Sequence, residues 1–95
     1  MAEGPGTPDP EGVDFRTFIL SLSTSAMLHL GEIPDPDGGE VVVNLELARQ
    51  TIGLLDMIKL KTAGNLTDDE DRTLSGLLYD LRIRFVARSG RSDAG

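Results

Sequence analysis

The side chains that could do acid–base chemistry in this 95-residue chain are few. His29 is the only histidine, and Ser25 lies four residues before it, so one helix would place both on the same side. A Ser–His pair still needs an orienting carboxylate and an oxyanion hole to act as a nucleophilic site. The sequence indicates neither, so we assign no catalytic residue. An enzyme that uses His29 with Ser25 and Tyr79 ranks third among our functional hypotheses.

The acidic turn Asp35–Glu40 has some features of a calcium loop. Glu46 falls twelve positions along when Asp35 is counted as the first, where an EF-hand loop has its bidentate glutamate. However, Pro36 interrupts the turn and Gly39 occupies a ligand position. We interpret the segment as an acidic turn. The chain contains no cysteine, which excludes disulfides and thiolate metal sites, and we expect no metal and no cofactor.

The elements that carry these residues are predicted to be helices. Asp14 and Asn44 are good N-caps, and Thr67 with Glu70 matches the capping box. The first two helices are expected to stop at Gly31 and Gly64. The fold class is therefore all-α, with three helices over about 15–30, 45–63 and 68–88, the last two forming a helical hairpin. Residues 13–88 form one helical domain between a disordered N-terminal arm at 1–12 and a disordered tail at 89–95.

The segment Glu32–Val43 is predicted to be a loop, because two prolines and a Gly-Gly pair interrupt any helix. A short two-stranded hairpin that pairs Ile33 with Val41–Val43 is a further prediction for this loop. Gly53 and Gly76 lie inside predicted helices. We expect Gly53 to lie on a solvent-exposed face of its helix. At Gly76 we expect close packing against another helix.

The charge balance limits the partners. The formal net charge is −7, which argues against general attraction to nucleic acid or anionic lipid. Arg82, Arg84 and Arg88 nevertheless cluster near the C-terminus. We interpret them first as cations placed favourably at the end of a helix, and the alternative is a docking patch for an acidic partner. No aromatic residues interleave with them as stacking RNA binders require. No segment has the length and apolarity of a membrane span, and the N-terminus lacks the pattern of a secretory signal, so we expect a cytoplasmic protein without membrane insertion.

The twelve residues Thr17–Leu28 contain no formal charge, which is unusual for a helix with one wet side. The third helix carries a second apolar stripe nearly opposite its main one. Since a single three-helix unit cannot bury all of this surface, we predict a homo-oligomer, with a dimer favoured. The first helix is expected to form the centre of the contact through Thr17, Ser21, Thr24, Ser25 and Leu28. Tyr79, Ile83 and Val86 on the third helix are expected to contribute to it. The alternative is that the Glu32–Val43 loop and the third helix cover the first helix within one chain.

Four segments of the chain resemble a known family. They are VDFRTFILSLSTSAMLHLGEIPDP at 13–36, NLELARQTIGLLDMI at 44–58, GNLTDDE at 64–70 and LLYDLRIRFV at 77–86. Together they are similar to the small bacterial family catalogued as domain of unknown function 1844. The resemblance implies a short, soluble, mostly helical bacterial protein. It implies no activity, substrate or catalytic residue.

The leading functional hypothesis is a self-associating adaptor or accessory subunit without catalysis, with a possible protein partner that the sequence does not identify. The alternative is a helical bundle that binds a small ligand or lipid in a hydroxyl-lined groove along the first helix.

Overall fold

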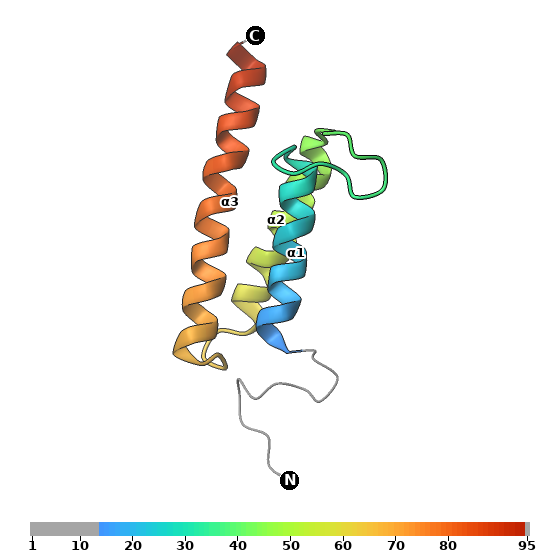
Figure 1. The fold of residues 1–95 in the computed structure, drawn as a ribbon. Coiled ribbons are helices and arrows are strands. Elements are labelled where there is room, and N and C mark those ends of the chain that lie inside the picture. The colour runs from blue at the N-terminus through green and yellow to red at the C-terminus, as the bar shows by residue number, and fades with distance from the viewer. Residues whose placement is uncertain (1–13, 95) are drawn as a thin grey trace.

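A computed structural model describes residues 14–94, with side chains described as far as Gly90. Three helices make up the fold: α1 (Phe15–His29), α2 (Leu45–Lys61) and α3 (Asp68–Ala94). No strand occurs among residues 14–94, so the predicted all-α class is confirmed. The chain runs up α1, down α2 and up α3, and α2 contacts both of the other helices (Figure 1).

The predicted helix starts are confirmed by their caps. The Asp14 carboxylate accepts a hydrogen bond from the Thr17 backbone N–H at 2.8 Å, which holds the pKa of that carboxyl below its usual value. Asn44 accepts from the Leu47 N–H at 3.0 Å. At α3 the Glu70 N–H donates to the Thr67 hydroxyl at 3.1 Å, and the Thr67 N–H donates to the Glu70 carboxylate at 2.9 Å. These groups satisfy N–H donors that a helix start leaves without intrahelical partners.

The helix ends differ from the sequence-based expectation. α1 and α2 stop at His29 and Lys61, one and two residues early, while the predicted stop glycines adopt positive φ angles of 79° at Gly31 and 84° at Gly64. α3 continues to Ala94, well past the predicted end near Arg88. The segment after Arg88 contains no proline, and one helical glycine costs only about 1 kcal/mol, which does not stop a helix. The predicted arm at 1–12 lies outside the described residues.

The hairpin predicted inside the Glu32–Val43 loop is wrong. Val41–Val43 form no strand, and all three side chains are exposed. Ile33 is followed by Pro34, which lacks the N–H that a strand ladder needs. The loop is closed instead by backbone hydrogen bonds from Asp35 N to Glu40 O at 2.7 Å and from Asn44 N to His29 O at 2.7 Å.

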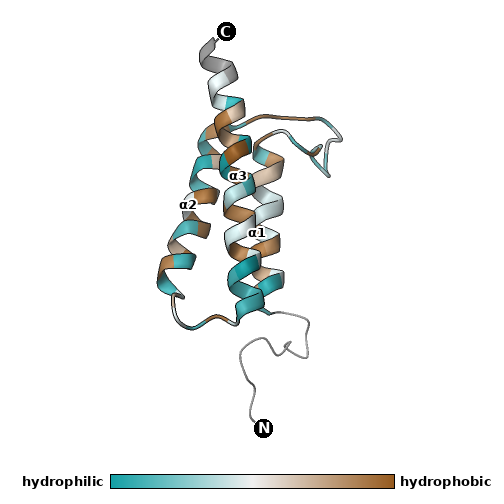
Figure 2. Ribbon diagram, turned by 90° about the vertical axis from the view of Figure 1, so that its left-hand side faces the viewer, coloured by the Kyte–Doolittle hydropathy of each residue, from teal (hydrophilic) through white to brown (hydrophobic). Residues whose placement is uncertain are grey.

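The core lies between the inner faces of the three helices. Figure 2 shows hydrophobic and hydrophilic segments alternating along each helix, as expected when one face of each is buried. Phe18, which the periodicity places on the core arc of α1, is instead 48% exposed. It lies at the edge of that arc, where a three-helix unit provides no cover. The buried apolar residues are Ile19, Ala26, Leu30, Ala48, Ile52, Leu55, Leu74, Leu78 and Leu81.

The close packing expected at Gly76 is not found within the chain. No heavy atom lies within 4 Å of the position that its Cβ would occupy. Gly53 is equally open, as expected for a wet face. Gly76 is therefore an exposed position on the outer side of α3.

The capping box at the start of α3 gives a stability prediction. Thr67→Ala removes the acceptor for the Glu70 N–H and should cost about 1 kcal/mol, lowering the melting temperature by roughly 4–8 °C. Thr73→Ala is the matched control, because the Thr73 hydroxyl only donates to the Asp69 carbonyl within the same helix. Thermal unfolding followed by circular dichroism measures both. Equal melting temperatures for the two variants would contradict a stabilising capping box.

Candidate interaction surfaces

The hydroxyl-rich face of α1 points away from the core. Thr17, Ser21, Thr24 and Ser25 are all exposed, and Leu28 is half-buried. The Ser21 hydroxyl donates to the Thr17 carbonyl and the Thr24 hydroxyl donates to the Leu20 carbonyl, each at 3.0 Å. Neither the loop nor α3 covers these four hydroxyl residues, so the alternative of coverage within one chain is wrong for them.

The second apolar stripe of α3 is also uncovered. Tyr79 is 70% exposed, Ile83 51% and Val86 65%. The main stripe on the opposite side supplies Leu74, Leu78 and Leu81 to the core, as the sequence predicts. α3 therefore separates its two stripes, one buried by α1 and α2 and the other facing outward.

An open groove runs beside this outer stripe, between α2 and α3. Its volume is about 540 Å³, and a smaller hollow of about 200 Å³ shares Arg82 and Val86 with it. Lys59 of α2 donates to the Ser75 hydroxyl at 2.9 Å and lies 3.7 Å from Asp71, which joins the two helices at one end of the groove. The larger groove is lined by Lys59, Ser75, Leu78, Tyr79, Arg82, Ile83 and Val86.

The three arginines of the predicted docking patch do not act together. Arg82 lines the groove and donates to Asp56 of α2 at 2.7 Å. Arg84 and Arg88 instead reach Glu32 after the end of α1, with nitrogen–oxygen distances of 2.8 and 3.5 Å. The predicted patch is thus divided between two sides of α3, and each member already has a carboxylate partner.

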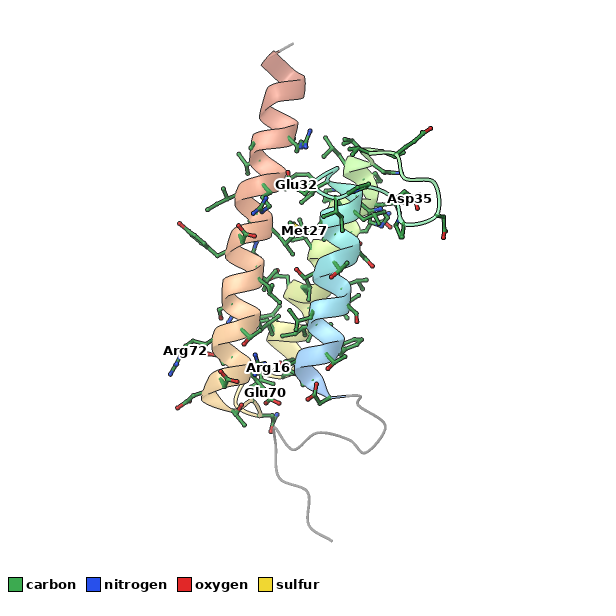
Figure 3. The ribbon with its side chains drawn as sticks, in the orientation of Figure 1. Arg16, Met27, Glu32, Asp35, Glu70 and Arg72 are labelled. Carbon is green, nitrogen blue, oxygen red and sulfur yellow. The ribbon has the colours of Figure 1, made fainter. Side chains whose placement is uncertain are left out.

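Glu32 joins the loop to α3 and was not singled out by sequence reasoning. Its side chain is 23% exposed and lies between the end of α1 and α3 (Figure 3). Asp80, which accepts a hydrogen bond from Arg84 Nε at 2.9 Å, raises the pKa of Arg84, and Glu32 adds to the effect. At the other end of α1, Arg16 pairs with Asp69 at 2.9 Å. The two contacts tie both ends of α1 to α3.

The residues of the enzyme hypothesis are not brought into one site. His29 is half-buried and Ser25 is exposed, and no hydrogen bond joins the two side chains among the described residues. Tyr79 belongs to the α2–α3 groove, which neither Ser25 nor His29 lines. In the acidic turn, the Asp35 carboxylate accepts from the Asp37 N–H at 2.8 Å. Among the side chains that the structure describes, residues 14–90, no group of three His, Asp or Glu has a geometry that could hold a metal ion.

A protein-family model matches residues 12–87, which is most of the chain. The chain belongs to the family described as Domain of unknown function (DUF1844). No solved structure matches this DUF1844 chain. Within the described part of the chain, no helix combines the length and apolarity needed to cross a membrane.

Several residues of the DUF1844 chain that matter to these surfaces were missed from the sequence. Lys59, Ser75 and Asp56 line or bridge the groove because the short α2–α3 link sets the two helices antiparallel. Following that register residue by residue would have found them. Glu32 and Arg88 lie 56 positions apart in sequence, and no local periodicity connects them.

Gly31 is the point where the loop, α1 and α3 of the DUF1844 chain meet. A Cβ at Gly31 would lie 2.6 Å from Val43 Cγ2, and the Gly31 carbonyl accepts from Arg88 at 3.3 Å. Gly64 also has a positive φ, but no heavy atom lies within 4 Å of its Cβ position. Replacing either glycine by a residue with a side chain would therefore strain the backbone. Only at Gly31 would the new Cβ also clash with a neighbouring side chain.

This difference gives a prediction. Gly64→Ala should cost about 1–2 kcal/mol of unfolding free energy through the left-handed backbone alone. Gly31→Ala should cost at least about 1 kcal/mol more, because Val43 must move away from the new methyl group. Urea unfolding measures both variants. Equal losses would mean that the loop does not pack tightly on Gly31.

Proposed function

We propose that this chain is a self-associating helical protein without catalysis, an adaptor or accessory subunit whose main contact is the outer stripe of α3 and its groove. The observation that carries the proposal is the exposure of Tyr79, Ile83 and Val86 on one side of one helix. Single exposed apolar residues are ordinary, but a contiguous stripe beside a groove is typical of an interaction surface.

The outer face of α3 is a stronger candidate for this contact than the face of α1. Transfer of apolar surface out of water contributes roughly 25 cal/mol per Å², and α3 offers an aromatic and two β-branched side chains. The exposed hydroxyls of Ser21 and Thr24 already bond within α1, so covering them costs little and contributes little. We keep the α1 stripe, Thr17, Ser21, Thr24, Ser25 and Leu28, as a secondary surface that allows close backbone approach.

The adaptor role rests on surface that self-association through α3 would leave free. Leu47, Leu54 and Met57 of α2 are each between 41% and 48% exposed. Arg84 and Arg88 are engaged with Glu32, so an acidic partner would have to compete with that carboxylate. A host protein that docks on apolar side chains of α2 therefore fits better than one that docks on the arginines. We place this role in the cytoplasm.

A second candidate function is binding of an amphipathic anion in the α2–α3 groove. Its volume of about 540 Å³ lies within the ordinary range of ligand sites, and Lys59 and Arg82 flank its apolar lining. This is not the hydroxyl-lined groove along α1 that the sequence predicts for a ligand. A small molecule that copurifies with the chain in native mass spectrometry and is lost in Ile83→Glu would support this function over self-association.

The proposed self-association gives a direct prediction. Sedimentation equilibrium at micromolar concentration should give twice the 10.2 kDa of one chain. Ile83→Glu should raise the dissociation constant at least about 30-fold, because a carboxylate buried against apolar surface costs about 2 kcal/mol or more. Leu60→Glu is the matched control, since Leu60 is 75% exposed on α2 and outside the stripe.

Two results would contradict the proposal. If the wild-type protein sediments with the mass of one chain, it does not self-associate. A mass that falls with Ser21→Lys and not with Ile83→Glu would move the main contact to α1. A folded Ile83→Glu monomer, verified by circular dichroism, would support the contact on α3.

A further inference from the structure

We infer that the occupant of the α3 stripe is α3 of a second copy, paired antiparallel, with Tyr79 of one copy packed over Gly90 of the other. This inference rests on the proposed self-association and names its partner, orientation and register. It draws on four features of the described residues: the spacing of the stripe, the sizes of its residues, the charges on its flanks and the groove beside it.

The spacing along the stripe is that of a coiled-coil seam. The outward residues are separated by three, four, three and four positions, which is the a/d pattern of a heptad repeat. All of them are exposed, and the core residues of α3 belong to a different side of the helix. The seam consists of Gly76, Tyr79, Ile83, Val86 and Gly90.

The sizes of the seam residues favour an antiparallel pair. In a parallel pair each seam residue faces the same residue of the second copy. The layer formed by two Tyr79 side chains would be crowded, and the two layers formed by glycine pairs would lack side chains. An antiparallel pair centred between Arg84 and Phe85 places Tyr79 opposite Gly90 and Ile83 opposite Val86. The largest seam residue then faces the smallest and the two β-branched residues face each other, so neither layer is crowded or empty. No heavy atom lies within 4 Å of the Cβ position of Gly90, so space for the ring is present.

The charges beside the seam select this register. In an antiparallel pair, a residue on one flank of the seam meets a residue on the same flank of the partner. With Tyr79 opposite Gly90, Arg82 meets Ser89 and Asp80 meets Ala87. Moving the pairing by one heptad, so that Gly76 lies opposite Val86, brings Arg82 onto Arg82 and Asp80 onto Asp80. Like charges at such positions are destabilising.

The groove and the length of α3 fit the same arrangement. α3 extends beyond the ends of α1 and α2, so its last turns project from the bundle (Figure 1). In the proposed register these turns lie along Ser75–Tyr79 of the second copy. They then lie beside the groove between α2 and α3 of that copy. The C-terminus of a helix carries partial negative charge, and it would approach Lys59 at that end of the groove.

Because the sequence contains no cysteine, any disulfide formed in a cross-linking test must join the introduced cysteines. Tyr79→Cys and Gly90→Cys, mixed in equal amounts with one of them carrying a mass tag, should form a disulfide-linked heterodimer on oxidation. Each variant alone should not link to itself, because two copies of residue 79 would lie about 16 Å apart along the seam at 1.5 Å per residue. Ile83→Cys mixed with Val86→Cys should also form a heterodimer in the adjacent layer, but only the 79/90 pair excludes self-linking, because two copies of residue 83 would lie about 4.5 Å apart along the seam.

The outcomes separate this inference from the proposed function. A dimer in which Tyr79→Cys links efficiently to itself would overturn the antiparallel register and leave self-association standing. A dimer without any α3 link, in which Ser21→Cys links to itself, would also overturn the inference. A one-chain particle for the cysteine-free protein would overturn both.

A second variant keeps the test independent of oxidation. Gly90→Trp fills the space assigned to Tyr79 and should raise the dissociation constant at least tenfold. Gly53→Trp is the matched control, because Gly53 is equally open but lies on α2, outside the seam. Circular dichroism verifies that both remain helical. Equal dissociation constants for the two folded variants would contradict packing of Tyr79 over Gly90.

Discussion

The structure depends on a small core that three helices must close from all sides. Among the described residues nine apolar side chains are buried, and six of the large ones are at most 2% exposed. A core of this size gives only modest stability, so the ends of the helices need their own contacts. Arg16 with Asp69 provides one at the start of α1, and Glu32 with Arg84 and Arg88 provides the other after its end. The capping groups of Asp14, Asn44 and Thr67 complete the bundle by satisfying the helix starts.

The same limit explains why so much apolar surface remains outside. Three helices have only one shared axis, so a helix with two apolar stripes can bury one of them. α3 buries Leu74, Leu78 and Leu81 and leaves Tyr79, Ile83 and Val86 beside the groove. The outer face of α1 differs, because it carries hydroxyls that donate hydrogen bonds to carbonyls one turn back in the same helix. The two outer faces are thus unequal: α3 exposes three adjoining apolar side chains, whereas the hydroxyls of α1 lie between its two exposed apolar side chains, Phe18 and Leu20.

The local features of the fold were predictable from the sequence, and the long-range contacts were not. N-caps, stop glycines and the two stripes of α3 follow from residue types within one or two helical turns. The end of α3 was predicted too early because the polar segment after Arg88 was interpreted as a disordered tail, although it contains no proline and one helical glycine is tolerated. The hairpin at Val41–Val43 failed because Pro34 and Pro36 remove donors from the opposing segment. The position of Glu32 between Arg84 and Arg88 depends on how segments far apart in sequence pack, whereas the position of Lys59 at the groove follows from the antiparallel register of α2 and α3.

The central claim is that the outer stripe of α3 is covered by another copy of the chain. Tyr79 is the only tyrosine and the sequence contains no tryptophan, so tyrosine fluorescence reports on this stripe alone. The direct measurement is acrylamide quenching of that fluorescence over a range of protein concentrations. We expect the quenching constant to fall severalfold as the protein concentration rises through the dissociation constant of the dimer. A quenching constant that stays high and unchanged into the millimolar range would contradict it.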